Sequence, residues 1–241
     1  MKSTVPNATR TNPNGKRVLE LLAGLYPDAA IALTFKTPWE LLVAVMLSAQ
    51  CTDKKVNEVT PGLFHQFPTM NAFASADKRT LEKLIFPTGF YHMKAAHIQQ
   101  TACTIAQTHH SAVPKTLAAL TALPGVGRKT AHIVLANAYG IATGIPVDTH
   151  VARISQRLRL VDIRTIGGNA PIWITGKNHP VLDYYRHPDT NRIETQLCTR
   201  IPKSQWNKIS YQIIEHGRAL CKALRPGCSS CSLAPLCPAA R

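Results

Sequence analysis

Apolar residues recur at helical spacing along most of the chain, and this periodicity constrains the possible fold more than any other feature. Val18, Leu21, Leu22 and Leu25 follow it near the start, before Pro27 ends the pattern. Almost no segment alternates as a strand would, so an all-α protein is predicted. Further helices are expected near residues 38–50, 54–64, 78–85, 93–109, 117–122, 128–138, 148–160, 191–200 and 206–220.

Two of the expected helices begin with capping signals. Thr37 can act as the N-cap, Pro38 suits the first helical position, and Glu40 can close a capping box. Asn191 with Glu194 resembles a second capping box, which predicts the start of a short helix.

Two segments lack helical periodicity. Residues 1–15 are polar, contain two prolines and end at Asn14-Gly15, which predicts a flexible N-terminal tail. Residues 165–188 contain a pair of glycines, three prolines and three aromatic residues without a clear period. A long loop is predicted there.

The charge balance indicates a polyanionic partner. The 241 residues include 28 Lys and Arg against 13 Asp and Glu, so the formal net charge is 28 − 13 = +15. Because neutralising phosphates releases condensed counterions, nucleic acid is the first candidate, and a merely soluble basic surface is the alternative. With 45% apolar residues, the chain can bury the core of one large domain or two small ones, and disorder is not expected.

No segment predicts a membrane span or a secretion signal. The longest uninterrupted apolar run covers residues 41–47, whereas a spanning helix needs ~18 residues. The N-terminus, MKSTVPNATR, lacks an apolar signal stretch. A cytoplasmic protein is therefore predicted, associated with the nucleoid if the source is bacterial.

A glycine-rich turn, LPGVG at residues 123–127, lies between two expected helices. Gly125 and Gly127 permit a tight turn and a close backbone approach, and the following helix presents unpaired amides and a positive dipole end. Such a turn, with Val126 between its glycines, can bind a phosphate. A plain helix connection is the alternative, but the helices on both sides and the net charge favour a helix-hairpin-helix.

Four of the seven cysteines lie close together in the sequence, with the spacing C-x6-C-x2-C-x5-C: Cys221, Cys228, Cys231 and Cys237. The other three are scattered, and without a signal peptide they do not indicate a disulfide framework. The four cysteines are therefore interpreted as a metal site. Four thiolates suit either tetrahedral zinc or an iron-sulfur cluster, and ligand chemistry alone does not distinguish them.

These motifs, in this order, resemble the endonuclease III family of DNA base-excision glycosylases. The matching segments cover nearly the whole chain: MLSAQ at residues 46–50, GFY at 89–91, LPGVGRKTA at 123–131, VDTH at 147–150, HGR at 216–218, and the terminal cysteines. The resemblance implies two helical domains. Residues 31–142 would form a six-helix barrel with the helix-hairpin-helix, and residues 16–30 with 143–241 would form a domain holding a 4Fe-4S cluster on the four cysteines.

The resemblance also implies two catalytic residues. Lys129 would attack the sugar C1′ carbon, form a Schiff base and so promote strand cleavage by β-elimination. Asp148, nineteen positions later, would assist loss of the damaged base by stabilising positive charge on the sugar. The alternatives are a surface lysine that touches phosphate and an ordinary Asp N-cap.

Four further residues are expected to contact DNA. By resemblance Gln50 enters the gap left by a flipped nucleotide, and Phe90 wedges beside the orphan base. The alternatives are a polar helix C-cap for Gln50 and a buried core aromatic for Phe90. Lys94 and Arg225 are basic neighbours that are expected to contact phosphates, and a structural role is the alternative for Lys94. The loop at residues 165–188, longer than the family's usual connection, is either a surface insertion or a flap that contacts DNA.

The implied activity is that of a bifunctional DNA glycosylase and AP lyase, removing oxidised pyrimidines from damaged duplex DNA as a monomer. An adenine-mismatch glycosylase is an enzymatic alternative, because it shares the hairpin and the cluster. It typically lacks a lysine at the position of Lys129. A DNA-binding scaffold without chemistry is the non-enzymatic alternative, and the presence of both Lys129 and Asp148 disfavours it.

Overall fold

The computed structural model describes residues 11–175 and 180–240. The chain divides into two compact units. Ile31–Thr143 forms one, which we call the barrel unit. The described residues of Met1–Ala30 and Gly144–Arg241 form the other, which we call the cysteine unit. The division expected from the sequence lies one residue earlier, between residues 142 and 143.

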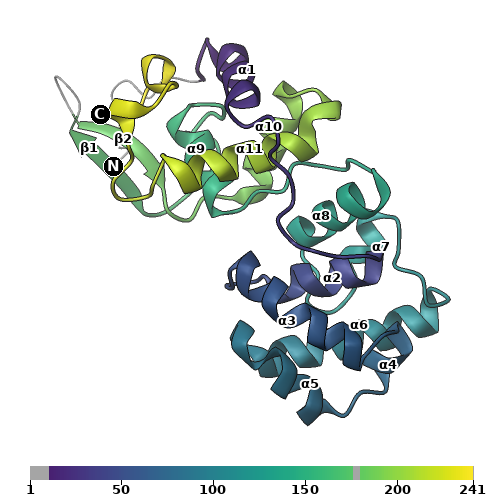
Figure 1. Ribbon diagram of the computed structural model, residues 1–241. Helices are drawn as coiled ribbons and strands as arrows, with labels where there is room; N and C mark the ends of the chain where they lie inside the picture. The colour runs from purple at the N-terminus through teal and green to yellow at the C-terminus, as the bar shows by residue number, and fades with distance from the viewer. Residues whose placement is uncertain (1–10, 176–179, 241) are drawn as a thin grey trace. The chain divides into compact units, whose positions relative to one another are not determined.

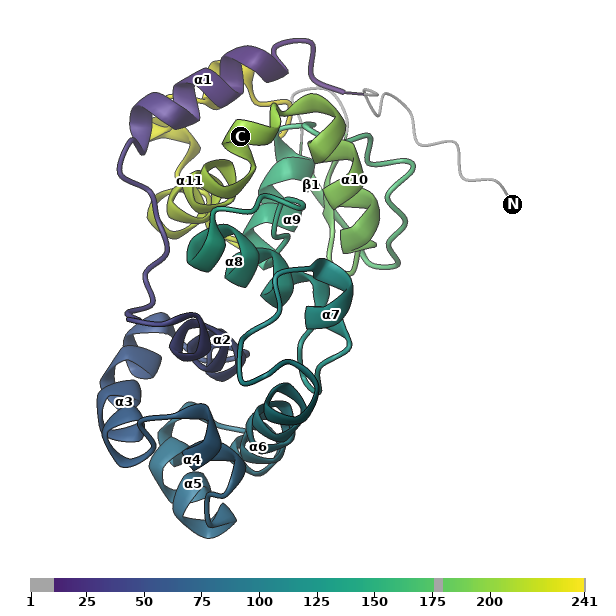
Figure 2. The same cartoon turned by 90° about the vertical axis from the view of Figure 1, so that its right-hand side faces the viewer.

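The barrel unit is built around a buried central helix. Helix α2 (Pro38–Leu47) is apolar on all sides, and every residue from 41 to 47 is buried, as expected for a helix in the middle of a core. It packs against α3, α6 and α8 (Figures 1 and 2). The helices around it are α3 (Asp53–Gln66), α4 (Met70–Ala74), α5 (Lys78–Ile85), α6 (Tyr91–Thr108), α7 (Leu117–Thr121) and α8 (Arg128–Tyr139), with the short 3-10 helix η1 (Phe86–Thr88) between α5 and α6.

The predicted cap of α2 is confirmed. The Thr37 hydroxyl accepts a hydrogen bond from the Glu40 amide at 3.1 Å. The Glu40 carboxylate turns back and accepts from the Lys36 amide at 2.6 Å, one residue before the N-cap. Local side chains therefore satisfy the Glu40 amide of the first turn and the amide that precedes the N-cap.

The cysteine unit contains four α-helices in its described part: α1 (Gly15–Leu25), α9 (Thr149–Arg157), α10 (Thr190–Arg200) and α11 (Trp206–Ala219). Helix α11 packs against both α1 and α9, and buried Leu22, Ile154 and Ile213 belong to their shared core. The unit also contains three 3-10 helices: η2 (Lys203–Gln205), η3 (Cys228–Ser230) and η4 (Ala234–Leu236).

The start of α10 corrects one prediction. The N-cap is Asp189, whose carboxylate accepts from the Asn191 and Arg192 amides at 2.9 and 3.2 Å. Asn191 therefore lies inside the first turn and is not the capping residue. Aspartate at this position also places negative charge at the positive end of the helix.

The prediction of a long loop at residues 165–188 is wrong for the central part of that segment. Strands β1 (Pro171–Thr175) and β2 (Pro180–Tyr185) pair there as an antiparallel β-hairpin, with a register irregularity between Ile172 and Trp173. Strand β2 packs against α9 (Figure 1). The segment is therefore an ordered addition to the cysteine unit, at least for the residues that the structure describes.

The predicted N-terminal tail is too long. Asn12 is buried, and its side-chain amide donates to the Leu158 and Leu236 carbonyls at 3.0 and 2.8 Å. Its backbone amide donates to the Arg159 carbonyl at 2.9 Å. The chain is therefore anchored from Asn12 onward, and residues 1–10 of the predicted tail lie outside the described range.

The all-α class is confirmed, with the β-hairpin as the one described sheet. Among the described helices, none combines the length and the apolar character that crossing a membrane requires.

Candidate active site and cysteine cluster

The glycine-rich turn of residues 123–127 packs tightly against α6. Gly125 has φ of +73°, and a Cβ atom there would lie 2.7 Å from His97 Nδ1 and 2.9 Å from His97 Cβ. The Thr101 hydroxyl donates to the Pro124 carbonyl at 2.9 Å. Both the left-handed backbone and the close approach of His97 require glycine at position 125.

The turn leads directly into the N-terminus of α8. Gly127 is the N-cap and has no side chain with which to cap the helix, and the first turn begins Arg128-Lys129-Thr130 without an acidic residue. Lys129 is exposed. Backbone amides, the positive end of the helix dipole and two cationic side chains therefore occur together, which is the arrangement that binds a phosphate.

Gln50 and Phe90 occupy two neighbouring turns with unusual backbone geometry. Both are non-glycine residues in the left-handed region, with φ of 53° and 49°. Phe90 is 58% exposed, so the alternative of a buried core aromatic is wrong. Ser48 is the C-cap of α2, so Gln50 is not the capping residue either. Gln50, Phe90 and Gly125 line the same cavity, of about 270 Å³.

Lys94 does not have the exposure that a phosphate contact needs. It is only 5% exposed, and its Nζ atom donates to the Leu47 and Thr88 carbonyls at 2.8 Å each. Burial lowers its pKa. Its hydrogen bonds to the protein backbone favour the structural role that was the alternative for Lys94 over a direct contact with DNA.

Asp148 is the N-cap of α9, as one of the two interpretations expected. Its Oδ1 atom accepts from the Val151 amide at 2.7 Å, and the residue is half-buried. The remaining oxygen, Oδ2, forms no hydrogen bond within the described residues. Capping therefore occupies one side of the carboxylate and leaves the other available. Lys129 belongs to the barrel unit and Asp148 to the cysteine unit.

The four clustered cysteines converge. Cys221, Cys228, Cys231 and Cys237 all line a cavity of about 30 Å³, and all are free thiols. Burial raises the pKa of the Cys237 thiol to about 11 and also raises that of Cys231. Within the described residues, no three His, Cys, Asp or Glu side chains are close enough to hold one metal ion. The four thiols therefore lie around one common space in the cysteine unit.

A buried arginine connects this cysteine cavity to the β-hairpin, and the sequence analysis missed it. Arg157, 2% exposed, forms a two-point ion pair with Asp183 of β2 at 2.8 Å. Its Nη1 atom lies 3.3 Å from Cys221 Sγ, and its guanidinium donates to the Lys222 and Ala223 carbonyls. Burial alone would lower the pKa of Arg157, but the hydrogen bonds and charge of Asp183 outweigh it and raise that pKa.

One sequence signal could have revealed this role. Arg153 and Arg157 lie four residues apart and therefore share a face of α9. Arg153 donates to the Cys221 carbonyl at 3.0 Å. Arg225, by contrast, is exposed in the loop between the first two cysteines, as a phosphate contact would need to be.

Two residues of the HGR segment, His216 and Gly217, make close packing contacts within the cysteine unit. The buried His216 ring lies 3.1 Å from the Tyr26 hydroxyl and 3.8 Å from Cys231 Sγ. A Cβ atom at Gly217 would clash with the His150 ring and lie 2.8 Å from Ile154 Cδ1. Glycine at 217 therefore allows α11 to pack closely on α9.

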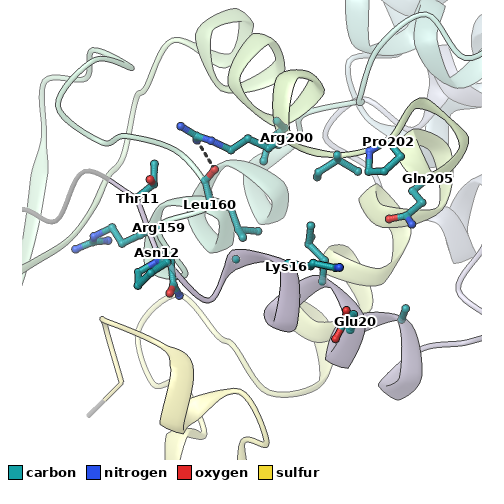
Figure 3. Close-up of a pocket in the computed structure, with 15 residues that line it drawn as sticks. Thr11, Asn12, Lys16, Glu20, Arg159, Leu160, Arg200, Pro202 and Gln205 are labelled. Carbon is teal, nitrogen blue, oxygen red and sulfur yellow. Dashed lines mark hydrogen bonds between the residues drawn. The ribbon is translucent and has the colours of Figure 1, made fainter.

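Figure 3 shows another cavity of the cysteine unit, of about 540 Å³, between the N-terminal segment with α1 and the end of α10. Arg200 Nη1 donates to the Leu160 carbonyl at its edge, at 2.7 Å. None of the residues that the sequence motifs assign to chemistry lines this cavity. We therefore do not assign the active site to this cavity, although it is larger than the cavity that Gln50 and Phe90 line.

The glycine turn, the open N-terminus of α8 and the helical surroundings define the class of a helix-hairpin-helix DNA-binding protein. Residues 43–165 match the family model described as "HhH-GPD superfamily base excision DNA repair protein". The chain is 42% identical to endonuclease III of Synechocystis sp. over 241 residues, covering 100% of this chain and 99% of the relative.

Two solved structures agree with this assignment. A non-covalent endonuclease III–DNA complex has a TM-score of 0.78 at 35% identity, covering 93% of this chain and 94% of that one. A trapped endonuclease III–DNA covalent intermediate has a TM-score of 0.78 at 34% identity, covering 94% and 96%. The chain belongs to the endonuclease III family of the HhH-GPD base excision DNA repair superfamily.

The geometry of the glycine turn yields a stability prediction. Gly125→Ala should lower the free energy of unfolding by about 2 kcal/mol, because alanine is strained at positive φ and its Cβ would clash with His97. Gly127→Ala is the matched control. Position 127 has negative φ and open space, so this change should cost less than about 1 kcal/mol. Urea unfolding followed by circular dichroism measures both, and equal losses would contradict the argument.

Proposed function

We propose that this chain excises oxidised pyrimidines from duplex DNA and then cleaves the strand, with Lys129 as the nucleophile and Asp148 as the assisting carboxylate. Membership of the family makes the chain a bifunctional DNA glycosylase and AP lyase of base excision repair. The observation that carries the residue assignment is the exposed amine of Lys129, in the first turn of the helix that follows the glycine turn. A phosphate held by that turn would bring the adjacent sugar within reach of this amine.

The chemistry proposed for Lys129 is covalent. Its neutral amine attacks C1′, the bond between C1′ and the base breaks, and the base leaves with the bonding electrons and takes up a proton. Loss of a proton from the amine and opening of the sugar give a Schiff base. This imine acidifies the C2′ proton, and its removal expels the 3′ phosphate and breaks the strand. The trapped covalent complex of the related endonuclease III supports a mechanism of this type.

Asp148 is proposed to act before that attack is complete. The helix N-terminus stabilises negative charge on its carboxylate. With Oδ1 engaged by the Val151 amide, Oδ2 can face positive charge that develops on the sugar as the base departs. The same hydrogen bond fixes the orientation of the carboxylate, so the cap and the catalytic role are compatible.

The four cysteines are proposed to hold a 4Fe-4S cluster. The proposal is supported by four thiols that line one cavity and by membership of a family whose terminal cysteines they resemble. A bound cluster would join the two ends of the loop at residues 222–227, because Cys221 and Cys228 flank it. Arg225 would then be presented on a rigid loop, where it can contact a phosphate. A damaged duplex as partner, bound by a monomer in the cytoplasm, completes the proposal.

Lys129→Gln should abolish strand cleavage and borohydride trapping on a duplex that contains thymine glycol or an abasic site, while duplex binding remains. The reason is that only an amine can form the reducible Schiff base. Lys78→Gln makes the same change at an exposed position of α5 and should trap at the wild-type rate. Cleavage and trapping by Lys129→Gln at the wild-type rate would show that the nucleophile lies elsewhere.

Asp148→Asn should slow base removal more than lyase action. An abasic site has already lost its base, so it no longer needs assistance for the leaving group, and some trapping on abasic DNA should survive. Single-turnover rates on thymine glycol and on abasic duplex measure the difference. Equal losses on both substrates would argue against this assignment.

The purified protein should be brown, with broad visible absorption and four irons and four sulfides per chain. Replacing Cys237 with serine should reduce the iron content, because its thiolate would be a ligand, whereas Cys103→Ser, at a half-buried free thiol outside the cluster, should not. Metal and sulfide analysis of anaerobically purified protein decides the matter. A result of one zinc per chain and no sulfide would show that the four cysteines hold zinc and would contradict the proposed cluster.

Phe90→Ala should change the free energy of unfolding by less than about 0.5 kcal/mol, because the ring is exposed. Excision from a duplex should nevertheless slow, since the ring would no longer support the opened stack. Phe73→Ala is the contrasting control, because that ring is fully buried and its loss should cost about 3 to 5 kcal/mol. Wild-type excision by Phe90→Ala would remove Phe90 from the interface.

A further inference from the structure

Lys94 is a buried cation that donates hydrogen bonds to two backbone carbonyls. Its Nζ atom lies 2.8 Å from both the Leu47 and the Thr88 carbonyl oxygens, and the residue is 5% exposed. Both of these hydrogen-bond acceptors are neutral backbone carbonyls and neither is a carboxylate. Burying an ammonium group without a counter-ion is costly, so its two carbonyl contacts must compensate for much of the lost hydration.

The two carbonyls belong to the turns that carry Gln50 and Phe90. Leu47 is the last residue of α2, and Gln50 follows three positions later. Thr88 ends η1, and Phe90 follows two positions later as the N-cap of α6. Carbonyls at the end of a helix lack partners within that helix, and a cation is favoured there. Lys94 therefore joins the ends of two segments that are 41 residues apart in sequence, since 88 − 47 = 41.

Backbone strain occurs on both turns. Gln50 and Phe90 have φ of 53° and 49°, in the left-handed region that non-glycine residues rarely adopt. Such conformations persist only where the surrounding contacts determine them. The ammonium group of Lys94 provides a shared contact of this kind for both turns.

The side chains also meet in one place. Gln50, Phe90 and Lys94 line the cavity of about 270 Å³, together with His97 of α6 and Gly125 of the glycine turn. Lys94 and His97 are three residues apart on α6, so one face of this helix contacts both the two turns and the glycine turn.

We propose that Lys94 is a positioning residue, which sets the spacing between Gln50 and Phe90 so that both can enter the duplex when the damaged nucleotide leaves the stack. This inference rests on the proposed function. Lys94 does not touch DNA and takes no part in bond breaking. Its effect should therefore be confined to steps that open a duplex.

The experiment compares Lys94→Met, which keeps the length of the side chain but removes the ammonium donors, with wild-type protein and with Lys78→Met as an exposed control. Three readouts are needed. Excision of thymine glycol from a duplex requires opening of the stack, and 2-aminopurine beside a tetrahydrofuran abasic analogue reports that opening by fluorescence. Borohydride trapping on a single-stranded abasic oligonucleotide requires no opening.

Lys94→Met should slow duplex excision by about 10- to 100-fold, the range expected when reacting or inserting groups are misplaced by about 1 Å. The fluorescence rise should be lost, while trapping on single-stranded DNA stays within about twofold of wild type. Lys94→Arg, which retains charge and donors, should recover part of both duplex signals. Lys78→Met should match wild type in all three readouts.

A double-mutant cycle tests the connection to Phe90. If Lys94 acts by placing Phe90, adding Lys94→Met to Phe90→Ala should slow excision less than it does in the wild-type background. Additive effects would overturn the inference, as would parallel losses of duplex excision and single-stranded trapping, which indicate a general folding defect. If Lys94→Met does not fold by circular dichroism, Lys94→Gln enters the same assays. Absence of trapping by wild-type protein would instead contradict the proposed function.

Discussion

The cysteine unit depends on the contacts of one buried guanidinium, that of Arg157. It neutralises Asp183 of the β-hairpin, stacks over Tyr184 at 5.1 Å and donates to carbonyls of the loop that follows Cys221. Because Arg157 is the last residue of α9, these contacts attach both the β-hairpin and the cysteine loop to that helix. Asp148 caps the opposite end of α9, so the helix that carries the proposed catalytic carboxylate is held at both ends. Removing either partner of the ion pair would leave a buried, uncompensated charge.

Lys94 has a comparable role in the barrel unit. In both units a long cationic side chain from a helix satisfies backbone carbonyl groups at helix ends or in loops, where no further turn of helix supplies a donor. The segments that follow these carbonyls carry Gln50, Phe90 and the cysteines. A segment whose side chains stay exposed, as Gln50 and Phe90 do, cannot stabilise itself by burying them, so the donors must come from elsewhere in the fold.

Sequence reasoning succeeded where structure is decided locally and failed where it depends on distant residues. The cap of α2 and the glycine turn were predictable, because each rests on contacts within a few residues or on backbone freedom at glycine. The β-hairpin was not. Its irregular register between Ile172 and Trp173 disrupts alternation in β1, while in β2 Leu182, Asp183 and Tyr184 are all buried. A strand buried on both faces and containing a charged residue shows neither the polar alternation nor the apolar run that would reveal it.

The sequence by itself determined the helical class, the glycine turn and the clustering of four thiols, since these follow from periodicity, glycine geometry and ligand type. Only the tertiary structure decided which cations face solvent. Lys94 and Arg225 are equivalent as basic residues in the sequence, yet one is buried on two carbonyls and the other is exposed. Likewise Asn12 is anchored by carbonyls 146 and 224 residues away. The physical reason is that the location of a long polar side chain depends on the acceptors that the folded chain brings near it, and those acceptors are backbone groups whose positions no local pattern encodes.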